Sequence, residues 1–209
     1  MGVLTGTAGP KLVAGVAVAM AAMATVLAVP VAVVGDSTPV PAVWKEQRIE
    51  FNYFGRTSRY SCEGIRDKLR AILANLGARH GIQAVVVPCD DFGGPGPRPT
   101  SSPTVHLVFS APSMPDAAAK PLHPGDLAPV DAHFEDFSLK TDAFRNMEPG
   151  DCELVEEFAR QVLPKLATRN VHKDITCIPY QQSGSQYWVR GEVLKALPPA
   201  APAGASQPR

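Results

Sequence analysis

The sequence has no excess of either charge, because 20 Lys and Arg residues balance 20 Asp and Glu residues. A nucleic-acid-binding protein needs a basic stripe to neutralise phosphates, and a polybasic membrane-surface protein needs a cluster of cations. The zero formal net charge therefore argues against both classes, and we expect no nucleic-acid partner.

The short motifs that signal well-known chemistries are missing too. The chain has no Gly-Lys-Ser/Thr of a P-loop, no H-E-x-x-H, no G-x-S-x-G, no Rossmann glycine pattern, no EF-hand loop and no C-x-x-C pair. These absences leave no residue to nominate as catalytic or cofactor-binding. We therefore expect no cofactor and favour a non-enzymatic role.

What the chain does contain is one segment twice. Cys62–Arg79 returns ninety positions later, without a gap, as Cys152–Arg169. Ordinary composition would give roughly one chance identity in such a window. Six positions are identical: Cys62/Cys152, Glu63/Glu153, Arg70/Arg160, Leu73/Leu163, Leu76/Leu166 and Arg79/Arg169. The duplication indicates an architecture of two similar halves, but it names no reaction.

The first 35 residues have the pattern of an export segment. A single cation, Lys11, precedes the uncharged apolar run Leu12–Val34. That run is longer than the usual core of a signal peptide and reaches the roughly 20 residues that span a bilayer. Two interpretations stay open: a signal peptide cleaved near Asp36, or an anchor in the inner membrane formed by residues 12–34. Either one predicts a periplasmic or secreted protein.

The cysteines fit export. Four cysteines follow this segment, and an even number in an oxidising compartment predicts disulfides. A helix over Cys62–Gly77 is about 24 Å long, and a strand over Gln83–Cys89 runs about 23 Å back to its start. The same geometry holds in the second copy, so we predict the pairs Cys62–Cys89 and Cys152–Cys177. The alternative is a nucleophilic thiol at a helix N-terminus.

Hydrophobic periodicity predicts the same order of elements in each half: strand, helix, strand, strand. In the first half we expect them at Arg48–Phe54, Cys62–Gly77 with Ser61 as N-cap, Ala84–Val87 and Val105–Phe109. In the second half we expect Val130–Leu139 with a bulge between Phe134 and Phe137, a helix capped by Asp151, Asp174–Ile178 and Gln186–Leu194.

These elements predict an α+β fold of two tandem split βαβ repeats. In each repeat the third strand would lie between two parallel strands joined by a right-handed crossover. The result is a two-layer sandwich with a six-stranded mixed sheet and two helices on one face. One domain would span residues 45–197, with pseudo-repeats at about 45–110 and 130–197 joined by a Pro-rich connection. Residues 36–44 would be a Pro-rich spacer and residues 198–209 a disordered tail.

The loop before the first helix is a candidate anion site. Arginines, hydroxyls and free helix N–H groups together could hold a phosphate, a carboxylate or a sugar acid. The residues concerned are Arg56, Thr57, Ser58, Arg59 and Ser61. The same residue types also suit an ordinary solvated surface loop.

The helix-free face of the sheet is a second candidate. Counting by twos places Glu50, His106, His133 and Glu135 on that face. Two histidines and two carboxylates could bind a divalent metal, although a polar outer face is ordinary for a sheet. A broader alternative is a docking surface that includes Trp188 and Arg190, because aromatic and arginine residues favour interfaces.

The segments Trp44–Cys62 and Asp151–Phe158 carry a resemblance. In them the chain resembles an uncharacterised group of small exported, signal-peptide-bearing proteins of Gram-negative bacteria, over roughly residues 44–198. The resemblance implies a periplasmic or envelope protein of unknown role, and it assigns no catalytic residues.

We therefore expect a disulfide-stabilised binding module for an envelope protein or another envelope component. The alternatives are an enzyme or binder for an anionic small molecule or glycan at the Arg56/Arg59 loop, and metal binding on the open sheet face. The membrane would be contacted only by an uncleaved N-terminal segment. The sequence leaves the oligomeric state open.

Overall fold

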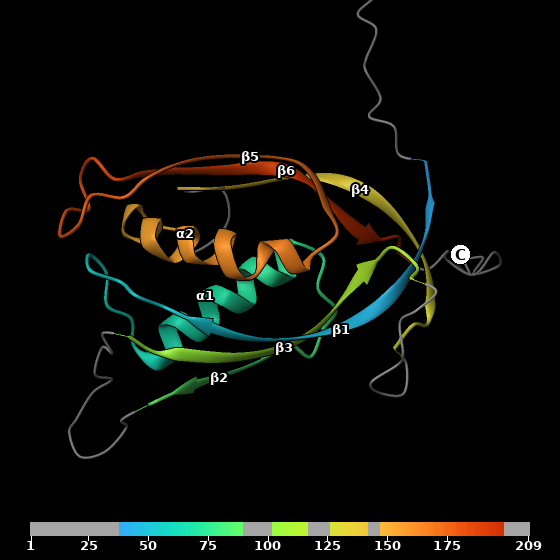
Figure 1. Cartoon of the computed structure of the whole chain (residues 1–209), viewed down its shortest axis with the longest axis horizontal. Helices are drawn as coiled ribbons and strands as arrows, with labels where there is room; N and C mark the ends of the chain where they lie inside the picture. The colour runs from blue at the N-terminus through green and yellow to red at the C-terminus, as the bar shows by residue number, and fades with distance from the viewer. Residues whose placement is uncertain (1–37, 90–101, 117–125, 142–146, 199–209) are drawn as a thin grey trace, which may run out of the picture. The chain divides into compact units, whose positions relative to one another are not determined.

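A computed structural model describes residues 38–89, 102–116, 126–141 and 147–198 (Figure 1). The expected export segment and nearly all of the expected tail lie outside these residues. In the described ranges, no helix has both the length and the hydropathy that a membrane span requires.

The described chain forms an α+β fold of six strands and two α-helices. In chain order the elements are β1 (Val40–Asn52), α1 (Cys62–Asn75), β2 (Gln83–Val87), β3 (Thr104–Ser113), β4 (Pro129–Lys140), α2 (Cys152–Gln161), β5 (Thr168–Thr176) and β6 (Gln186–Ala196). Short 3-10 turns precede and follow α2, at Pro149–Asp151 and Leu163–Lys165.

The sheet is open and antiparallel throughout. Its strand order is β2-β3-β1-β4-β6-β5, and every neighbouring pair is antiparallel. The prediction of a mixed sheet is therefore wrong. The sheet is antiparallel because β3 lies between β1 and β2, and β6 lies between β4 and β5. No two parallel strands are therefore neighbours. Figure 1 shows α1 and α2 between the β1–β3 strands and the β4–β6 strands.

Strand β1 begins inside the segment expected to be a spacer. Residues Val40–Val43 pair with β4, although Pro41 lies among them. Pairing of β1 with β3 ends at Val43, so among the described strands Pro41 has a neighbour on one side only. A proline is tolerated there because its missing N–H can face the open side of the strand.

Helix α1 begins and ends as its sequence predicts. The hydroxyl of Ser61 accepts the Gly64 N–H at 3.0 Å and so caps the first turn. The helix stops at Leu76, and Gly77 follows with φ of 87°. This left-handed conformation favours glycine, and an added Cβ would lie 2.9 Å from Cγ of Lys195.

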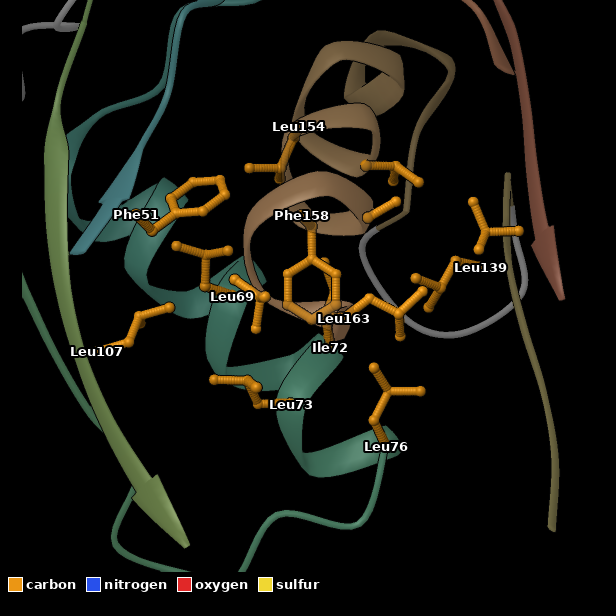
Figure 2. Packing of buried hydrophobic residues seen from close by; sticks show 14 of the residues in the cluster. Phe51, Leu69, Ile72, Leu73, Leu76, Leu107, Leu139, Leu154, Phe158 and Leu163 are labelled. Atoms are coloured by element: carbon orange, nitrogen blue, oxygen red, sulfur yellow. The ribbon is translucent and has the colours of Figure 1, made fainter. Parts of the chain in front are cut away.

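Both helices and one face of the sheet share one hydrophobic core. Phe158 of α2 is fully buried, and Figure 2 shows it among leucine and isoleucine side chains of both helices. The strands contribute alternate residues such as Phe51, Leu107 and Leu139. We call this the core face of the sheet and the opposite side the outer face. Burial of each large side chain stabilises the fold by roughly 1.5–3 kcal/mol.

Strand β4 changes the face on which its apolar residues lie. Its pairing with β6 is continuous from Ala132 to Lys140, so the predicted bulge between Phe134 and Phe137 is absent. Phe137 and Leu139 enter the main core, whereas Ala132 and Phe134 join a small second cluster. Because alternate residues of a strand point to opposite faces, that second cluster lies on the outer face.

Both predicted disulfides are present. Cys62 pairs with Cys89 and Cys152 with Cys177, with Cα–Cα distances of 5.9 and 5.6 Å. No cysteine is free, which excludes a nucleophilic thiol. Each bond ties the start of a helix to the end of the following strand, and each should contribute about 3–4 kcal/mol by restricting the unfolded chain. Two disulfides favour an oxidising, extracytoplasmic environment.

Candidate functional site

The four metal-ligand candidates do not meet. Glu50 and His106 lie opposite each other on β1 and β3, on the outer face. His133 and Glu135 have the parity of Phe137 and Leu139, which places them on the core face. The prediction that all four share one face is wrong, because it assumed a bulge that β4 does not have.

The two residues on the core face, His133 and Glu135, lie close to each other and to a lysine of the neighbouring strand. His133 Nε2 lies 3.6 Å from Glu135 Oε2, and Lys195 Nζ lies 2.6 Å from Glu135 Oε1. Across the described ranges, no three His, Cys, Asp or Glu side chains are grouped so as to hold a metal ion.

The loop expected to bind an external anion holds an internal carboxylate. Glu153 of α2 accepts the backbone N–H groups of Arg56 at 2.7 Å and Thr57 at 2.8 Å. The Thr57 hydroxyl lies 3.1 Å from its other oxygen. Glu153 is only 7% exposed, so these contacts are shielded from solvent. A carboxylate of the chain itself therefore takes the place that the sequence suggested for a ligand.

The other predicted anion-binding residues have separate structural roles. Ser61 caps α1, and the backbone carbonyl of Ser58 accepts the Tyr53 hydroxyl at 2.7 Å. The Thr57 hydroxyl accepts the N–H of Tyr180 at 3.1 Å. Arg59 is exposed, and it lines an open cleft of about 500 Å³ together with Thr57, Ser58 and Lys68. The loop thus ties the first half to the second, and anion binding at this cleft stays a prediction.

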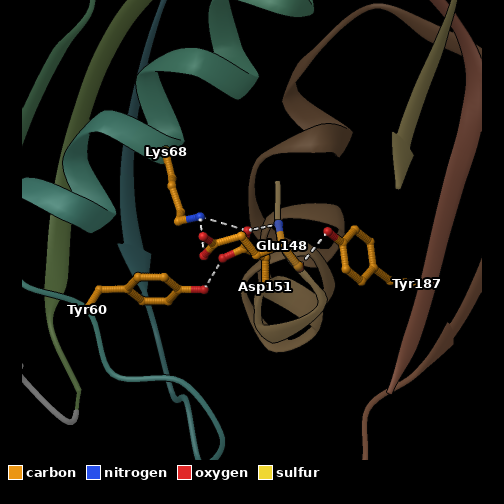
Figure 3. Close-up of polar contacts among 5 residues, drawn as sticks. All are labelled: Tyr60, Lys68, Glu148, Asp151 and Tyr187. Atoms are coloured by element: carbon orange, nitrogen blue, oxygen red, sulfur yellow. Dashed lines mark hydrogen bonds and ion pairs between the residues drawn. The ribbon is translucent and has the colours of Figure 1, made fainter. Parts of the chain in front are cut away.

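A buried polar cluster lies beside that cleft (Figure 3). Asp151 is 1% exposed, and its carboxylate accepts the Tyr60 hydroxyl at 2.5 Å and the Lys68 ammonium at 2.8 Å. It also accepts the Glu148 N–H at 2.7 Å, and the Tyr187 hydroxyl donates to the Glu148 carbonyl at 2.9 Å. The cluster joins α1 to the start of α2 and to β6.

Asp151 was expected to cap α2 with its side chain, and it does not. Its carboxylate makes no capping bond to α2 and instead closes the preceding 3-10 turn through Glu148. The reason is that Tyr60 and Lys68 draw the carboxylate towards α1. Asp151 occupies a position that is typical of a helix cap, but its side chain links the two halves instead.

Two tyrosines near this cluster are held in their neutral form. Burial raises the pKa of Tyr60, and the charge of Asp151 and the hydrogen bond to it raise that pKa further. Burial, followed by the charge of Glu153, raises the pKa of Tyr53. Both hydroxyls therefore stay protonated and donate, as their hydrogen bonds require. Since Asp151 accepts from Tyr60, Lys68 and the Glu148 N–H, the cluster stabilises the fold.

A hollow lies on the outer face over β4, β6 and β5. Its volume is about 630 Å³. Its polar lining comes from alternate residues of β4 and β6 and from the bulged part of β5. We call it the Trp188 groove and define it by Asp136, Ser138, Lys140, Asn170, His172, Trp188, Arg190 and Glu192.

Trp188 is exposed and held in place. It is 42% exposed, and its indole Nε1–H donates to the Ser138 hydroxyl at 3.2 Å. The guanidinium carbon of Arg190 lies 4.3 Å from the ring centroid, which is a cation–π contact. The indole is therefore a fixed apolar platform with part of its surface free.

Charged groups around Trp188 differ in whether they are paired. Glu192 accepts hydrogen bonds from Arg169 at 2.8 Å and Asn170 at 2.6 Å, which lower its pKa and keep it ionised. The side chains of Asp136, Lys140 and His172 make no hydrogen bond or ion pair within the described ranges. They leave both a negative and a positive group available in the groove.

The bulge of β5 helps to shape the groove. Pairing with β6 shifts between Arg169 and His172, and Asn170 has φ of 54°. Gly191 faces the bulge, where an added Cβ would lie 3.0 Å from the Arg169 carbonyl oxygen. Glycine is needed because the backbones approach closely.

The sequence identified Trp188 and Arg190 as part of this surface but missed Asp136, Lys140 and His172. These three are ordinary polar residues in strands. They meet only because of the pairing register, in which Lys140 lies opposite Trp188 and His172 opposite Arg190.

Comparison of the chain with protein-family models, with curated proteins and with solved structures finds no match. A fold alone does not define a function, so the geometry of the site is what bears on it.

Proposed function

We propose that the two halves are copies of one split βαβ unit, packed as a two-layer sandwich with both helices on one face. The contact between the halves supports this. Strand β1 pairs with β4 as Val40↔Ala132 and Ala42↔Val130, around Pro41↔Asp131. Residues 130–132 follow residues 40–42 by ninety positions, the period of the sequence repeat. Such reciprocal pairing is the pattern of a two-fold axis.

The pairing inside each half supports the same proposal. Ile49 lies opposite Leu107 and Leu139 opposite Val189, so offsets of 90 (139 − 49) and 82 (189 − 107) relate the two pairs. The same offsets carry Lys45↔Ala111 onto Glu135↔Val193. Arginines in the two copies also stack alike, because Arg79 lies 4.1 Å from the Trp44 ring centroid and Arg169 lies 4.1 Å from that of Phe134.

This alignment gives the groove residues of β4 and β6 counterparts in the first half. Trp188 corresponds to His106, Lys140 to Glu50 and Ser138 to Arg48. In the first half Arg48 forms an ion pair with Glu46 at 2.7 Å, whereas Ser138 supports the indole of Trp188. The Trp188 groove is thus a feature of the second half alone.

The protein is, on this proposal, a non-enzymatic binding module that uses the Trp188 groove to bind a protein or another component of the cell envelope. One observation carries the proposal: a fixed, exposed indole surrounded by unpaired Asp136, Lys140 and His172. Recognition sites combine an apolar anchor with a few convergent polar groups. The partner should present an apolar surface to Trp188 together with hydrogen-bond donors and acceptors.

The proposed location is the periplasm or the extracellular space of a Gram-negative bacterium. The two disulfides support it, as does the apolar N-terminal run of the sequence. The proposed membership in a group of small exported envelope proteins rests on the segments Trp44–Cys62 and Asp151–Phe158.

Crosslinking in intact cells followed by a pulldown tests the proposal. The wild-type chain should recover a specific partner, and Trp188→Ala should lose it because the anchor of the groove is gone. His106→Ala is the matched control, since it alters the counterpart position. Recovery of no specific partner by the wild type, or equal recovery by both variants, would contradict the proposal.

A further inference from the structure

We propose that the outer edge of β2 pairs antiparallel with β2 of a second copy of this chain, centred on Val85. The proposal concerns the opposite end of the sheet from the Trp188 groove and does not depend on it. It rests on a difference between the two edge strands, β2 and β5.

Strand β5 is protected against pairing. It carries the charged residues Arg169, Lys173 and Asp174, and its bulge interrupts a flat edge. Charges and bulges on an edge strand are the usual devices that keep another chain from adding to a sheet.

Strand β2 has neither device. The segment Gln83–Val87 contains no charged residue and no proline, and it pairs with β3 in continuous register. Val85 is 57% exposed and Val87 is 46% exposed. Within the described ranges β3 is the only strand that pairs with β2, so its other edge presents unpaired backbone groups beside two exposed valines. An uncharged, apolar edge without a bulge is a template for another strand.

The segment is complementary to itself. In an antiparallel pair centred on Val85, Gln83 of one copy lies opposite Val87 of the other, and Ala84 lies opposite Val86. No charge is buried, and the exposed valines of the two copies form one apolar row on the outer face. A charged partner strand would find no complementary group on β2. The zero net charge of the chain also removes long-range repulsion between copies.

Antiparallel pairing would continue the arrangement already present in the sheet, where every neighbouring pair is antiparallel. The β1–β4 junction has the same reciprocal form around Pro41↔Asp131, over only four residues of each strand. A five-residue pair is a small interface, so the association should be weak, with a Kd on the order of micromolar to millimolar.

Sedimentation velocity of the purified full chain over a range of concentrations tests the proposal. The wild type should show a monomer–dimer equilibrium, and Val85→Lys should weaken it by about tenfold or more because it places two ammonium groups opposite each other. Thr176→Lys, on the exposed side of β5, is the matched control and should leave the equilibrium unchanged. Thermal unfolding of each variant checks that the fold is kept. A wild type that stays monomeric up to about 1 mM, or a dimer that Val85→Lys does not weaken, would overturn the proposal.

Cysteine crosslinking tests the register. Val85→Cys should form a disulfide-linked dimer with itself, because position 85 lies on the two-fold axis. Val87→Cys should crosslink only when it is mixed with Gln83→Cys, since two copies of position 87 would be about 13 Å apart along the strand. Efficient crosslinking of Val87→Cys alone, with none for Val85→Cys, would exclude this pairing.

Discussion

The two α-helices begin with the same Cys-Glu pair and use it differently. In α1 the glutamate, Glu63, is exposed, and the Ser61 hydroxyl caps the first turn. In α2 the corresponding Glu153 is buried and binds the loop that leads into α1, while Asp151 is buried against Tyr60 and Lys68. The comparison shows that polar residues of the second half hold the first half in place.

The outer face of the sheet also differs between the two halves. On the outer face the first half presents Glu50 and His106, which lie opposite each other on neighbouring strands. At the positions that the proposed repeat aligns with these two, the second half presents Lys140 and Trp188, which line the groove. We infer that the first half serves mainly as scaffold and that the second half carries the binding surface.

The largest effect is expected from removing the cation beside Asp151. Lys68→Met should lower the free energy of unfolding by about 3–5 kcal/mol, because a carboxylate that is 1% exposed loses its ion-pair partner. Denaturant unfolding without reductant measures this. Arg66→Met is the control, since its ion pair with Asp67 is exposed and should contribute less than about 1 kcal/mol. Equal effects of the two substitutions would show that the ion pair with Lys68 does not stabilise the buried Asp151 carboxylate.

Alkaline pH should destabilise the protein through Tyr53 and Tyr60. Both have a raised pKa in the folded state, so above about pH 10 the unfolded chain releases two protons that the folded chain retains. The free energy of unfolding should then fall by about 1.4 kcal/mol per pH unit for each tyrosine.

Unfolding measured between about pH 9 and 12 checks this slope. Tyr60→Phe should remove roughly half of it, because one of the two retained protons is gone. An unchanged slope in this variant would mean that Tyr60 ionises normally in the folded protein.

Glu153→Gln should lower the free energy of unfolding by about 1–3 kcal/mol. The reason is that an amide cannot accept all three hydrogen bonds that the carboxylate accepts, from the N–H groups of Arg56 and Thr57 and from the Thr57 hydroxyl. Glu63→Gln, at the same position of the other copy, should change stability by less than about 0.5 kcal/mol. Amide hydrogen exchange would locate the effect, with faster exchange at Arg56 and Thr57 in Glu153→Gln only. A similar loss from both substitutions would remove the distinction between the two helix starts.

The smallest effect on stability is expected at Trp188. Trp188→Ala should lower the free energy of unfolding by about 1 kcal/mol or less, because the side chain lies on the outer face and is 42% exposed. Partner recovery should nevertheless be lost. A large loss of stability would instead identify Trp188 as a structural residue of the sheet.

Features that depend on local spacing could be predicted from the sequence. The cap at Ser61, the end of α1 at Gly77 and the two disulfides each follow from residues within one strand–helix–strand segment. Helix and strand lengths are enough to bring such residues together.

Features that depend on distant partners could not be predicted in this way. Glu153 binds Arg56 across 97 positions of sequence, and Tyr60 reaches Asp151 across 91. The face on which His133 lies depends on the register of β4, because a shift of one residue exchanges the two faces of a strand. The groove needs three strands in register before its residues meet.

Site-specific photocrosslinking in intact cells tests most directly whether the second half carries the binding surface. A photoreactive amino acid is placed at Lys140, in the groove, or at its counterpart Glu50, and the products are separated by mass after irradiation. We predict a crosslinked partner from position 140 and none above background from position 50. Crosslinking from both positions, or from position 50 alone, would contradict the division of the molecule into scaffold and binding surface.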